Sequence, residues 1–330
     1  MKGVKDMLQS ICIARLCIIV LFAMLPIGVA AQSAAKHKEP IIDMHLHVGP
    51  QDSNTGKPTS PKASDLAEFK KFAAAMKRRN VVKAVVFGPL EYVHSMIEAA
   101  PDRIIGSSMF PYPYADPRLP DLAILREEYR AGRLGAMGEI LVQYHGLAPN
   151  DTSLEPYFAL AEELDIPVGI HMGIAPPGVS YKDSKFWHAP KFRMSLGNPL
   201  LLEDVLLRHP KLRLWVMHDV WPMLDELIGL LHAHPHVYAD LAVLDVLPRK
   251  EFHSYLRRLV ELGYGERLMY GSDTGPGSWP RGSIEAIESA TFLTKQQKRD
   301  IFYNNAARFL RLGEERQVKS LSKNRNDESD

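Results

Sequence analysis

The most informative residues of this sequence are two histidines, His45 and His47, which close a short apolar run that begins at Ile41. In a β-strand, side chains two residues apart point to the same side, so both imidazoles can reach one ion. Imidazole nitrogen is the commonest protein ligand for zinc and also binds other first-row metals. The pair therefore predicts half of a metal site. Asp43 is expected to support this strand end as a hydrogen-bond acceptor.

Four further ionisable residues end apolar runs in the same way. They are Glu139, His171, His218 and Asp273. Taken alone, each is more often a hydrogen-bonded residue at a strand end than a ligand. Burying all six groups together is costly unless a cation compensates them. The set therefore favours a metal site.

Eight apolar runs would carry these groups, and their lengths suit strands buried on both faces. They span Ile41 to His47, Val81 to Phe87, Ile104 to Phe110, Leu134 to Leu141, Pro167 to Met172, Leu212 to His218, Val237 to Val243 and Leu268 to Asp273. Helices are predicted between and after these runs, over Ala63 to Arg79, Tyr92 to Ala100, Leu119 to Ala131, Leu154 to Leu164, Pro199 to Arg208, Met223 to His232, Arg249 to Leu262 and Lys295 to Leu310. Asn198 and Thr294 are predicted to cap two of these helices. A (β/α)8 barrel is the leading fold, and an open doubly wound sheet is the alternative.

The order of these motifs resembles the amidohydrolase superfamily, and more narrowly its amidohydrolase-related branch of hydrolases and decarboxylases. The resemblance rests on the six residues named above, on the segments from Met217 to Glu226 and Tyr270 to Asp273, and on the segment from Tyr303 to Phe309. It implies a single α/β domain, a (β/α)8 TIM barrel over residues 36–313, with the metal at the carboxyl ends of the strands.

Two ligand arrangements follow from the resemblance. With one ion, His45, His47, His171 and Asp273 hold the metal, and His218 orients or deprotonates the water. With two ions, His171 and His218 bind the second, and Glu139 bridges the pair. We predict Glu139 as a ligand, Asp273 and His218 as the catalytic residues, and a divalent metal, most simply zinc, as the cofactor, with one or two ions per chain.

Three functions remain open at this stage. The leading one is hydrolysis of a small-molecule ester, lactone or amide by metal-activated water. The second is decarboxylation of a small unsaturated or aromatic acid, which needs a cation such as Arg193, Lys191 or Arg249 to hold the carboxylate. The third is a non-catalytic binding protein built on the barrel, which an intact ligand set argues against.

Several side chains near these strand ends are candidates for the substrate pocket. They are Gln143, His145, Trp187, His188 and Arg193. The last three lie in a long connection, Gly173 to Leu196, that we expect to cover the barrel mouth. A separate cluster of histidines at positions 232, 234 and 236 precedes the seventh strand at the opposite end of the barrel. It predicts surface histidines rather than a second metal site.

The first 35 residues predict a Sec-type secretory signal, with cleavage near residues 31–35. Three basic residues precede an apolar stretch from Leu16 to Val29, which ends in alanines. An uncleaved anchor is the alternative and would need about 20 apolar residues. Both cysteines, Cys12 and Cys17, lie in this segment, so the mature chain would have no disulfide. We expect a periplasmic or secreted protein with no stable membrane anchor after cleavage.

The rest of the composition bounds the partners. A net charge of +1 gives no indication of a nucleic-acid partner. Residues 314–330 are polar and lack periodicity, which predicts disorder. The expected partner is a small-molecule substrate, and the exposed outer helices leave a homodimer open.

Overall fold

The computed structural model describes residues 39–49, 60–111, 118–185, 187–276 and 282–313. The predicted signal segment and the predicted disordered tail both lie outside these residues. Within the described part of the chain, no helix combines the length and the apolar character needed to span a bilayer.

Eight parallel strands form one sheet in chain order. They are β1 Ile41–His47, β2 Val81–Gly88, β3 Ile104–Phe110, β4 Ala136–Ile140, β5 Val168–Ile170, β6 Leu214–Val216, β7 Tyr238–Asp240 and β8 Leu268–Met269. The segment from β8 onward pairs with β1: the Met44 N–H donates to the Tyr270 carbonyl at 2.9 Å, and the Asp273 N–H donates to the His45 carbonyl at 2.8 Å. The predicted barrel is therefore confirmed, and the open sheet is excluded.

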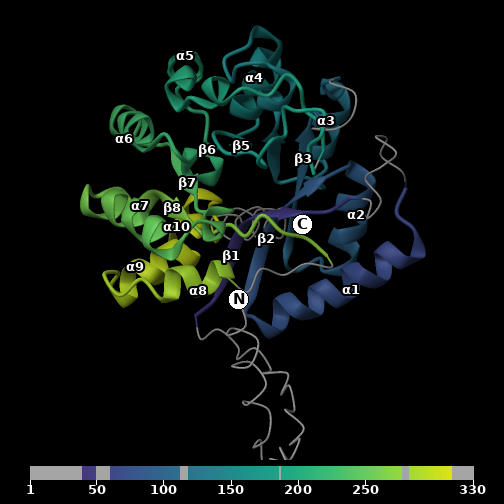
Figure 1. Ribbon diagram of the computed structural model, residues 1–330. Coiled ribbons are helices and arrows are strands. Elements are labelled where there is room, and N and C mark those ends of the chain that lie inside the picture. The colour runs from purple at the N-terminus through teal and green to yellow at the C-terminus, as the bar shows by residue number, and fades with distance from the viewer. Residues whose placement is uncertain (1–38, 50–59, 112–117, 186, 277–281, 314–330) are drawn as a thin grey trace, which may run out of the picture. The chain divides into compact units, whose positions relative to one another are not determined.

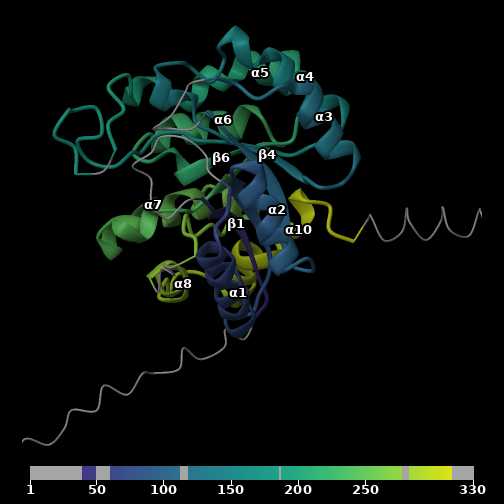
Figure 2. The same cartoon turned by 90° about the vertical axis from the view of Figure 1, so that its right-hand side faces the viewer.

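Helices surround the strands (Figures 1 and 2). They are α1 Ala63–Arg78, α2 Leu90–Ala99, α3 Leu122–Arg130, α4 Glu155–Glu163, α5 Glu203–Arg208, α6 Leu224–Ala233, α7 Arg249–Glu261, α8 Gly282–Glu288, α9 Lys295–Arg299 and α10 Asn305–Phe309. The predicted caps are confirmed, since Asn198 Oδ1 accepts from the Leu200 N–H at 3.0 Å and Thr294 Oγ1 accepts from the Gln297 N–H at 3.1 Å. The last predicted helix is divided by a π-helical turn, Asp300–Asn304, and α8 was not predicted.

Strands β6, β7 and β8 end two, three and four residues earlier than predicted, and a residue in the left-handed conformation follows each of them. His218 has φ 60°, Val243 has φ 69° and Asp273 has φ 51°. Such values are uncommon for residues other than glycine, and strained positions of this kind gather at functional sites. Two of the predicted donors, His218 and Asp273, therefore have strained backbone and lie two and four residues after the ends of β6 and β8.

A column of buried aromatic rings supports the end of β1 from below. Phe87 of β2 packs against His45 with ring centroids 5.4 Å apart, and Trp215 of β6 packs against Phe87 at 6.2 Å. Phe309 of α10 then meets Trp215 at 5.5 Å. Each buried aromatic contributes roughly 1.5–3 kcal/mol of hydrophobic stabilisation. The side chains at the end of β1 are thus supported by closely packed apolar rings.

Candidate metal centre

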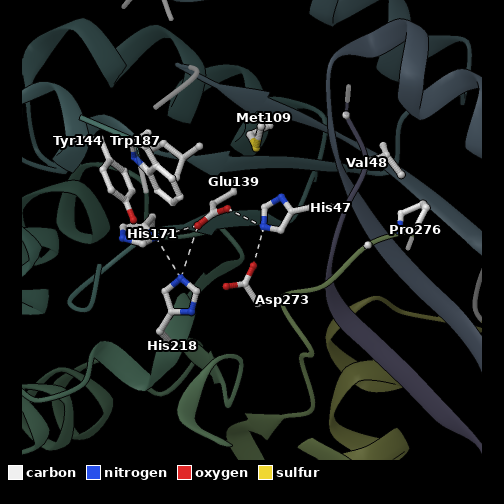
Figure 3. Close-up of a pocket in the computed structure, with 13 residues that line it drawn as sticks. His47, Val48, Met109, Glu139, Tyr144, His171, Trp187, His218, Asp273 and Pro276 are labelled. Atoms are coloured by element: carbon white, nitrogen blue, oxygen red, sulfur yellow. Dashed lines mark hydrogen bonds and ion pairs between the residues drawn. The ribbon is translucent and has the colours of Figure 1, made fainter. Parts of the chain in front are cut away.

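All six predicted donors lie together at the carboxyl ends of the strands, and five of them are labelled in Figure 3. His45 and His47 come from β1 and Glu139 from β4; His171, His218 and Asp273 follow β5, β6 and β8. We call these residues the donor cluster. Gly138, just before Glu139, has φ 106° and lies so close to the Gly169 carbonyl that a Cβ atom would be 2.1 Å from its oxygen. Only glycine fits there, so β4 can approach β5 and present its carboxylate.

Around the end of β1, four donor atoms have the spacing of ligands around one ion. His45 Nε2 lies 3.1 Å from His47 Nε2, and Asp273 Oδ1 lies 3.5 and 2.8 Å from these two nitrogens. Glu139 Oε2 lies 3.5 and 3.3 Å from the same nitrogens. A tetrahedral ion with bonds of about 2.0–2.1 Å separates its donors by about 3.3 Å. This group therefore fits a divalent metal.

Glu139 turns its other oxygen toward a second pair of histidines. Glu139 Oε1 is 2.8 Å from His171 Nδ1 and 3.6 Å from His218 Nε2, and those two nitrogens are 3.0 Å apart. Among the described residues, His171 Nε2 is buried without a hydrogen-bond partner. His171 thus belongs with Glu139 and His218 rather than with the β1 histidines. This arrangement matches the expected two-ion pattern better than the one-ion pattern.

The pKa shifts of the two carboxylates and of His171 favour the forms that bind metals, whereas neighbouring carboxylates, against the effect of burial, raise the pKa of His45 and of His218 and favour their protonated forms. Binding of a cation would displace those protons. Burial opposes ionisation of Asp273, but His45 and His47 hold the pKa of this carboxyl at about 2. Burial likewise opposes ionisation of Glu139, yet the surrounding histidines hold its pKa well below the usual range. Burial lowers the pKa of His171, which favours the neutral imidazole. Ionised carboxylates and neutral imidazoles are the ligand forms that a divalent ion requires.

Asp240, the last residue of β7, orients two of the donors, and we did not identify it from the sequence. Its Oδ2 lies 3.2 Å from His45 Nδ1 and accepts from Trp215 Nε1 at 3.2 Å. Its Oδ1 accepts from the His218 N–H at 3.0 Å. A carboxylate on the far nitrogen fixes the tautomer of a ligand histidine. The available signal was an aspartate inside an otherwise apolar predicted strand.

Asp43 ties β1 to the segment that carries Asp273. Its Oδ1 accepts from the backbone N–H groups of His45 and Ser272, at 3.1 and 3.0 Å. Burial raises the pKa of Asp43 to about 7, although these hydrogen bonds act in the opposite direction. The residue supports the strand end as a hydrogen-bond acceptor, as predicted.

A cavity of about 410 Å³ opens onto the donor cluster (Figure 3). Its other lining side chains include Met109, Leu141, Tyr144 and Trp187. Of the five pocket residues predicted from the sequence, Trp187 lies in this lining. Met109, Leu141 and Tyr144 were missed.

The other four predicted pocket residues do not line the cavity. Gln143 is buried, and its Nε2 donates to the carbonyls of Gly173 and Arg193, both at 3.1 Å. Arg193 is exposed, and its guanidinium donates to nearby backbone carbonyls. His188 is exposed and His145 is half-buried. For Gln143 and His145, the reason is that the chain turns into a short 3-10 helix, Val142–His145 (η2), directly after β4, so strand alternation no longer applies.

We compared the chain with protein families and with known proteins. A family model described as amidohydrolase matches residues 42–312. A comparison with curated proteins found no match.

Three of the similar solved structures differ in their described activities. A probable 2-pyrone-4,6-dicarboxylic acid hydrolase from Acinetobacter baumannii is 17% identical, with TM-score 0.56, over 82% of this chain and 98% of that one. A 4-oxalomesaconate hydratase from Rhodopseudomonas palustris is 16% identical, with TM-score 0.57, over 88% and 100%. A 5-carboxyvanillate decarboxylase from Novosphingobium aromaticivorans, solved with manganese, is 15% identical, with TM-score 0.55, over 84% and 98%. At these identities, the likeness supports the fold alone.

Proposed function

This chain belongs to the amidohydrolase family, and from that premise we propose that it is a metal-dependent hydrolase of a small-molecule ester, lactone or amide. The observation that carries the proposal is the contrast between the two carboxylates of the donor cluster. The side chain of Glu139 is 3% exposed, and its two oxygens face two groups of histidines. The side chain of Asp273 is 23% exposed and lines the cavity. Asp273 can therefore exchange a proton with a substrate.

In the proposed hydrolysis, the metal and Asp273 have different roles. A bound divalent metal lowers the pKa of water and polarises a carbonyl oxygen. Asp273 accepts a proton from the water while the oxygen of the water bonds to the carbonyl carbon. Asp273 then returns that proton to the leaving oxygen or nitrogen as the bond to the carbonyl carbon breaks. The products are a carboxylic acid and an alcohol or amine.

The donors support a proposal for the metal itself. Nitrogen and carboxylate oxygen donors spaced for tetrahedral geometry suit zinc, although manganese accepts the same donor types. Because Glu139 directs one oxygen to each group of histidines, we propose two zinc ions per chain. In this arrangement His171 and His218 are ligands of the second ion. Elemental analysis of the purified protein tests both the identity and the number, and one ion per chain would contradict the bridging place of Glu139.

Decarboxylation is the competing reaction, and the placement of the cations argues against it. We expected Arg193, Lys191 or Arg249 to hold a departing carboxylate. All three are exposed, and none lines the cavity as the described residues define it. Hydrolysis requires no such cation, because the metal polarises an uncharged carbonyl group.

A substrate panel separates the two reactions. Metal-loaded protein is incubated with phenyl acetate, dihydrocoumarin and acetanilide as hydrolysis substrates, and with hydroxylated benzoic acids as decarboxylation substrates. We expect acid release from the first set and no carbon dioxide from the second. Carbon dioxide release without hydrolysis would overturn the proposal. The variant Asp273→Asn, which keeps the size of the side chain, controls for contaminating esterases.

We also propose that the enzyme acts in the periplasm or outside the cell. Support comes from the basic and apolar pattern of the first 31 residues. N-terminal sequencing of protein from a native-type host tests this, with a mature start near residues 31–35 as the expected result. A start at residue 1 in the cytoplasmic fraction would contradict it.

A further inference from the structure

Tyr144 is a cavity residue that the hydrolytic scheme does not yet use. It lies on η2, five residues after Glu139, and is 5% exposed. Its ring packs against His171, Phe192 and Trp187, with centroid distances of 4.8, 5.2 and 5.8 Å. Packing on three sides leaves the side chain little freedom to change rotamer. The position of its hydroxyl is therefore fixed before a substrate arrives.

The Tyr144 hydroxyl is directed toward His171 at the edge of the cavity (Figure 3). No hydrogen bond joins it to any other described residue, whereas four other buried tyrosines of the described chain do have partners. Those hydroxyls contact the Ser108 hydroxyl and Ala136 carbonyl (Tyr129), the Pro120 carbonyl (Tyr157), the Asp219 carbonyl (Tyr255) and the Ser283 hydroxyl (Tyr270). A buried polar group normally has a partner. The Tyr144 hydroxyl is thus placed to bind a ligand in the cavity.

Burial and nearby carboxylates favour the protonated form of this hydroxyl. Burial raises the pKa of Tyr144 well above its usual value, and the nearby carboxylates Glu139 and Asp273 raise it further. This direction favours the neutral phenol, which can donate a hydrogen bond. A donor that needs no reorganisation is most useful where negative charge develops during a reaction.

The wall beside Tyr144 is apolar and partly aromatic. Figure 3 shows Tyr144 and Trp187 together on one side of the cavity, with His47, Val48 and Pro276 on the other side. Met109 and Leu141 also line the space. Indole and thioether groups make favourable contacts with a flat aromatic ring. The cavity therefore combines a hydroxyl donor with a surface on which such a ring can stack.

We propose that Tyr144 and Trp187 form the substrate subsite, and that the substrate is an ester or lactone with an aromatic ring beside its scissile bond. The ring stacks on Trp187, and the Tyr144 hydroxyl donates a hydrogen bond to the carbonyl oxygen as negative charge develops there. No proton leaves Tyr144. The inference deepens the proposed function and rests on it for the reaction.

The variant Tyr144→Phe tests the hydrogen bond while keeping the packed ring. Removing one such donor from a preorganised site lowers kcat by about 10²–10³-fold. Because a bound metal would also stabilise the negative charge on the carbonyl oxygen, we expect a smaller loss of roughly 10–100-fold. With phenyl acetate and dihydrocoumarin, KM should change less than kcat, and the metal content should stay at the wild-type value. Tyr157→Phe is the matched control, because its hydroxyl bonds the Pro120 carbonyl away from the cavity, and it should retain wild-type kcat.

A binding measurement tests the subsite without relying on turnover. The probes are phenylphosphonate, which joins a tetrahedral anion to a flat ring, and methylphosphonate, which lacks the ring. We expect metal-loaded Tyr144→Phe to bind both probes more weakly than wild type. We expect Trp187→Leu to weaken phenylphosphonate binding alone.

The outcomes separate the two proposals. If wild type cleaves none of the esters and lactones but shows this binding pattern, the proposed function fails and the subsite stands. If Tyr144→Phe keeps kcat and phenylphosphonate affinity within twofold of wild type, the subsite is overturned. The same holds if Trp187→Leu binds both probes like wild type.

Discussion

Two parts of this barrel contain histidines with the same spacing, yet only one is built to hold a metal. At the carboxyl ends of the strands, His45 and His47 have Asp273 and Glu139 oxygens within 3.5 Å. Ahead of β7, His234 and His236 have ring centroids 6.2 Å apart, and the Glu203 carboxylate is 3.9 Å from His234 Nε2. The prediction of a surface cluster is wrong for His234, which is buried.

This contrast shows that the spacing of the histidines alone is a weaker indication of a metal site than the carboxylates around them. Carboxylates from other strands make the first group a site, because they supply the negative charge that a divalent ion needs. Burial, His234 and the nearby Arg267 guanidinium lower the pKa of His236. A neighbouring cation opposes metal binding. Altering one carboxylate at each place is therefore the most direct way to test the comparison.

The largest effect is expected from Asp273→Asn. Losing the group that exchanges the proton should lower kcat/KM by about 10²–10⁴-fold. Glu203→Gln, which neutralises the carboxylate nearest His234, is the matched control and should stay within twofold of wild type. Steady-state hydrolysis of phenyl acetate measures both variants. Equal losses in the two variants would show that the carboxylates matter through general stability alone.

The second prediction concerns Asp240, which orients His45 and His218 without lining the cavity. Asp240→Asn should weaken metal affinity about 10–100-fold, since partners of ligand histidines typically have effects of this size. Competition with a chromogenic chelator measures the affinity. Excess metal should restore part of the activity, which it would not do if Asp240 took part in the reaction itself. Unchanged metal affinity would remove the positioning role.

Most of the donor cluster could be predicted from the sequence because it depends on strands. His45, His47 and Glu139 lie on β1 and β4, where alternation and the end of an apolar run locate a side chain reliably. The cavity wall could not be predicted in this way. After Ile140 the chain turns into η2, so Tyr144 faces the cavity, whereas Gln143 donates hydrogen bonds to the carbonyls of Gly173 and Arg193 in the connection after β5. Asp240 escaped notice because the predicted strand continued three residues beyond it.

The third prediction concerns the effect of metal removal on thermal stability, with and without His234 and His236. A ligand that binds only the folded state stabilises it by about 2.7 kcal/mol at a free concentration 100 times its Kd. Chelation should therefore lower the thermal unfolding midpoint of wild type and of the double variant His234→Gln/His236→Gln by the same amount. Calorimetry with and without chelator checks this. A smaller chelator effect in the double variant would place a metal at the second histidine group.

The smallest effect is the part of the pH dependence of stability that arises from His236. Burial, His234 and Arg267 lower the pKa of His236 in the folded state below the ordinary value of 6.5. The unfolded chain therefore takes up a proton at this position at a higher pH than the folded protein does. Stability is lost as the pH falls from above 6.5 toward the lowered pKa of His236, because protonation pulls the equilibrium toward the unfolded state.

His236→Gln removes that proton uptake and should be less sensitive to acid than wild type between pH 8 and 5.5. Urea unfolding of both proteins at the two pH values measures the difference, and the donor cluster, which is the same in both, cancels from it. Parallel pH profiles would mean that His236 is solvated like an ordinary surface histidine. A flatter profile in the variant would show that burial, His234 and the Arg267 guanidinium keep His236 neutral, whereas the histidines of the donor cluster are surrounded by carboxylates.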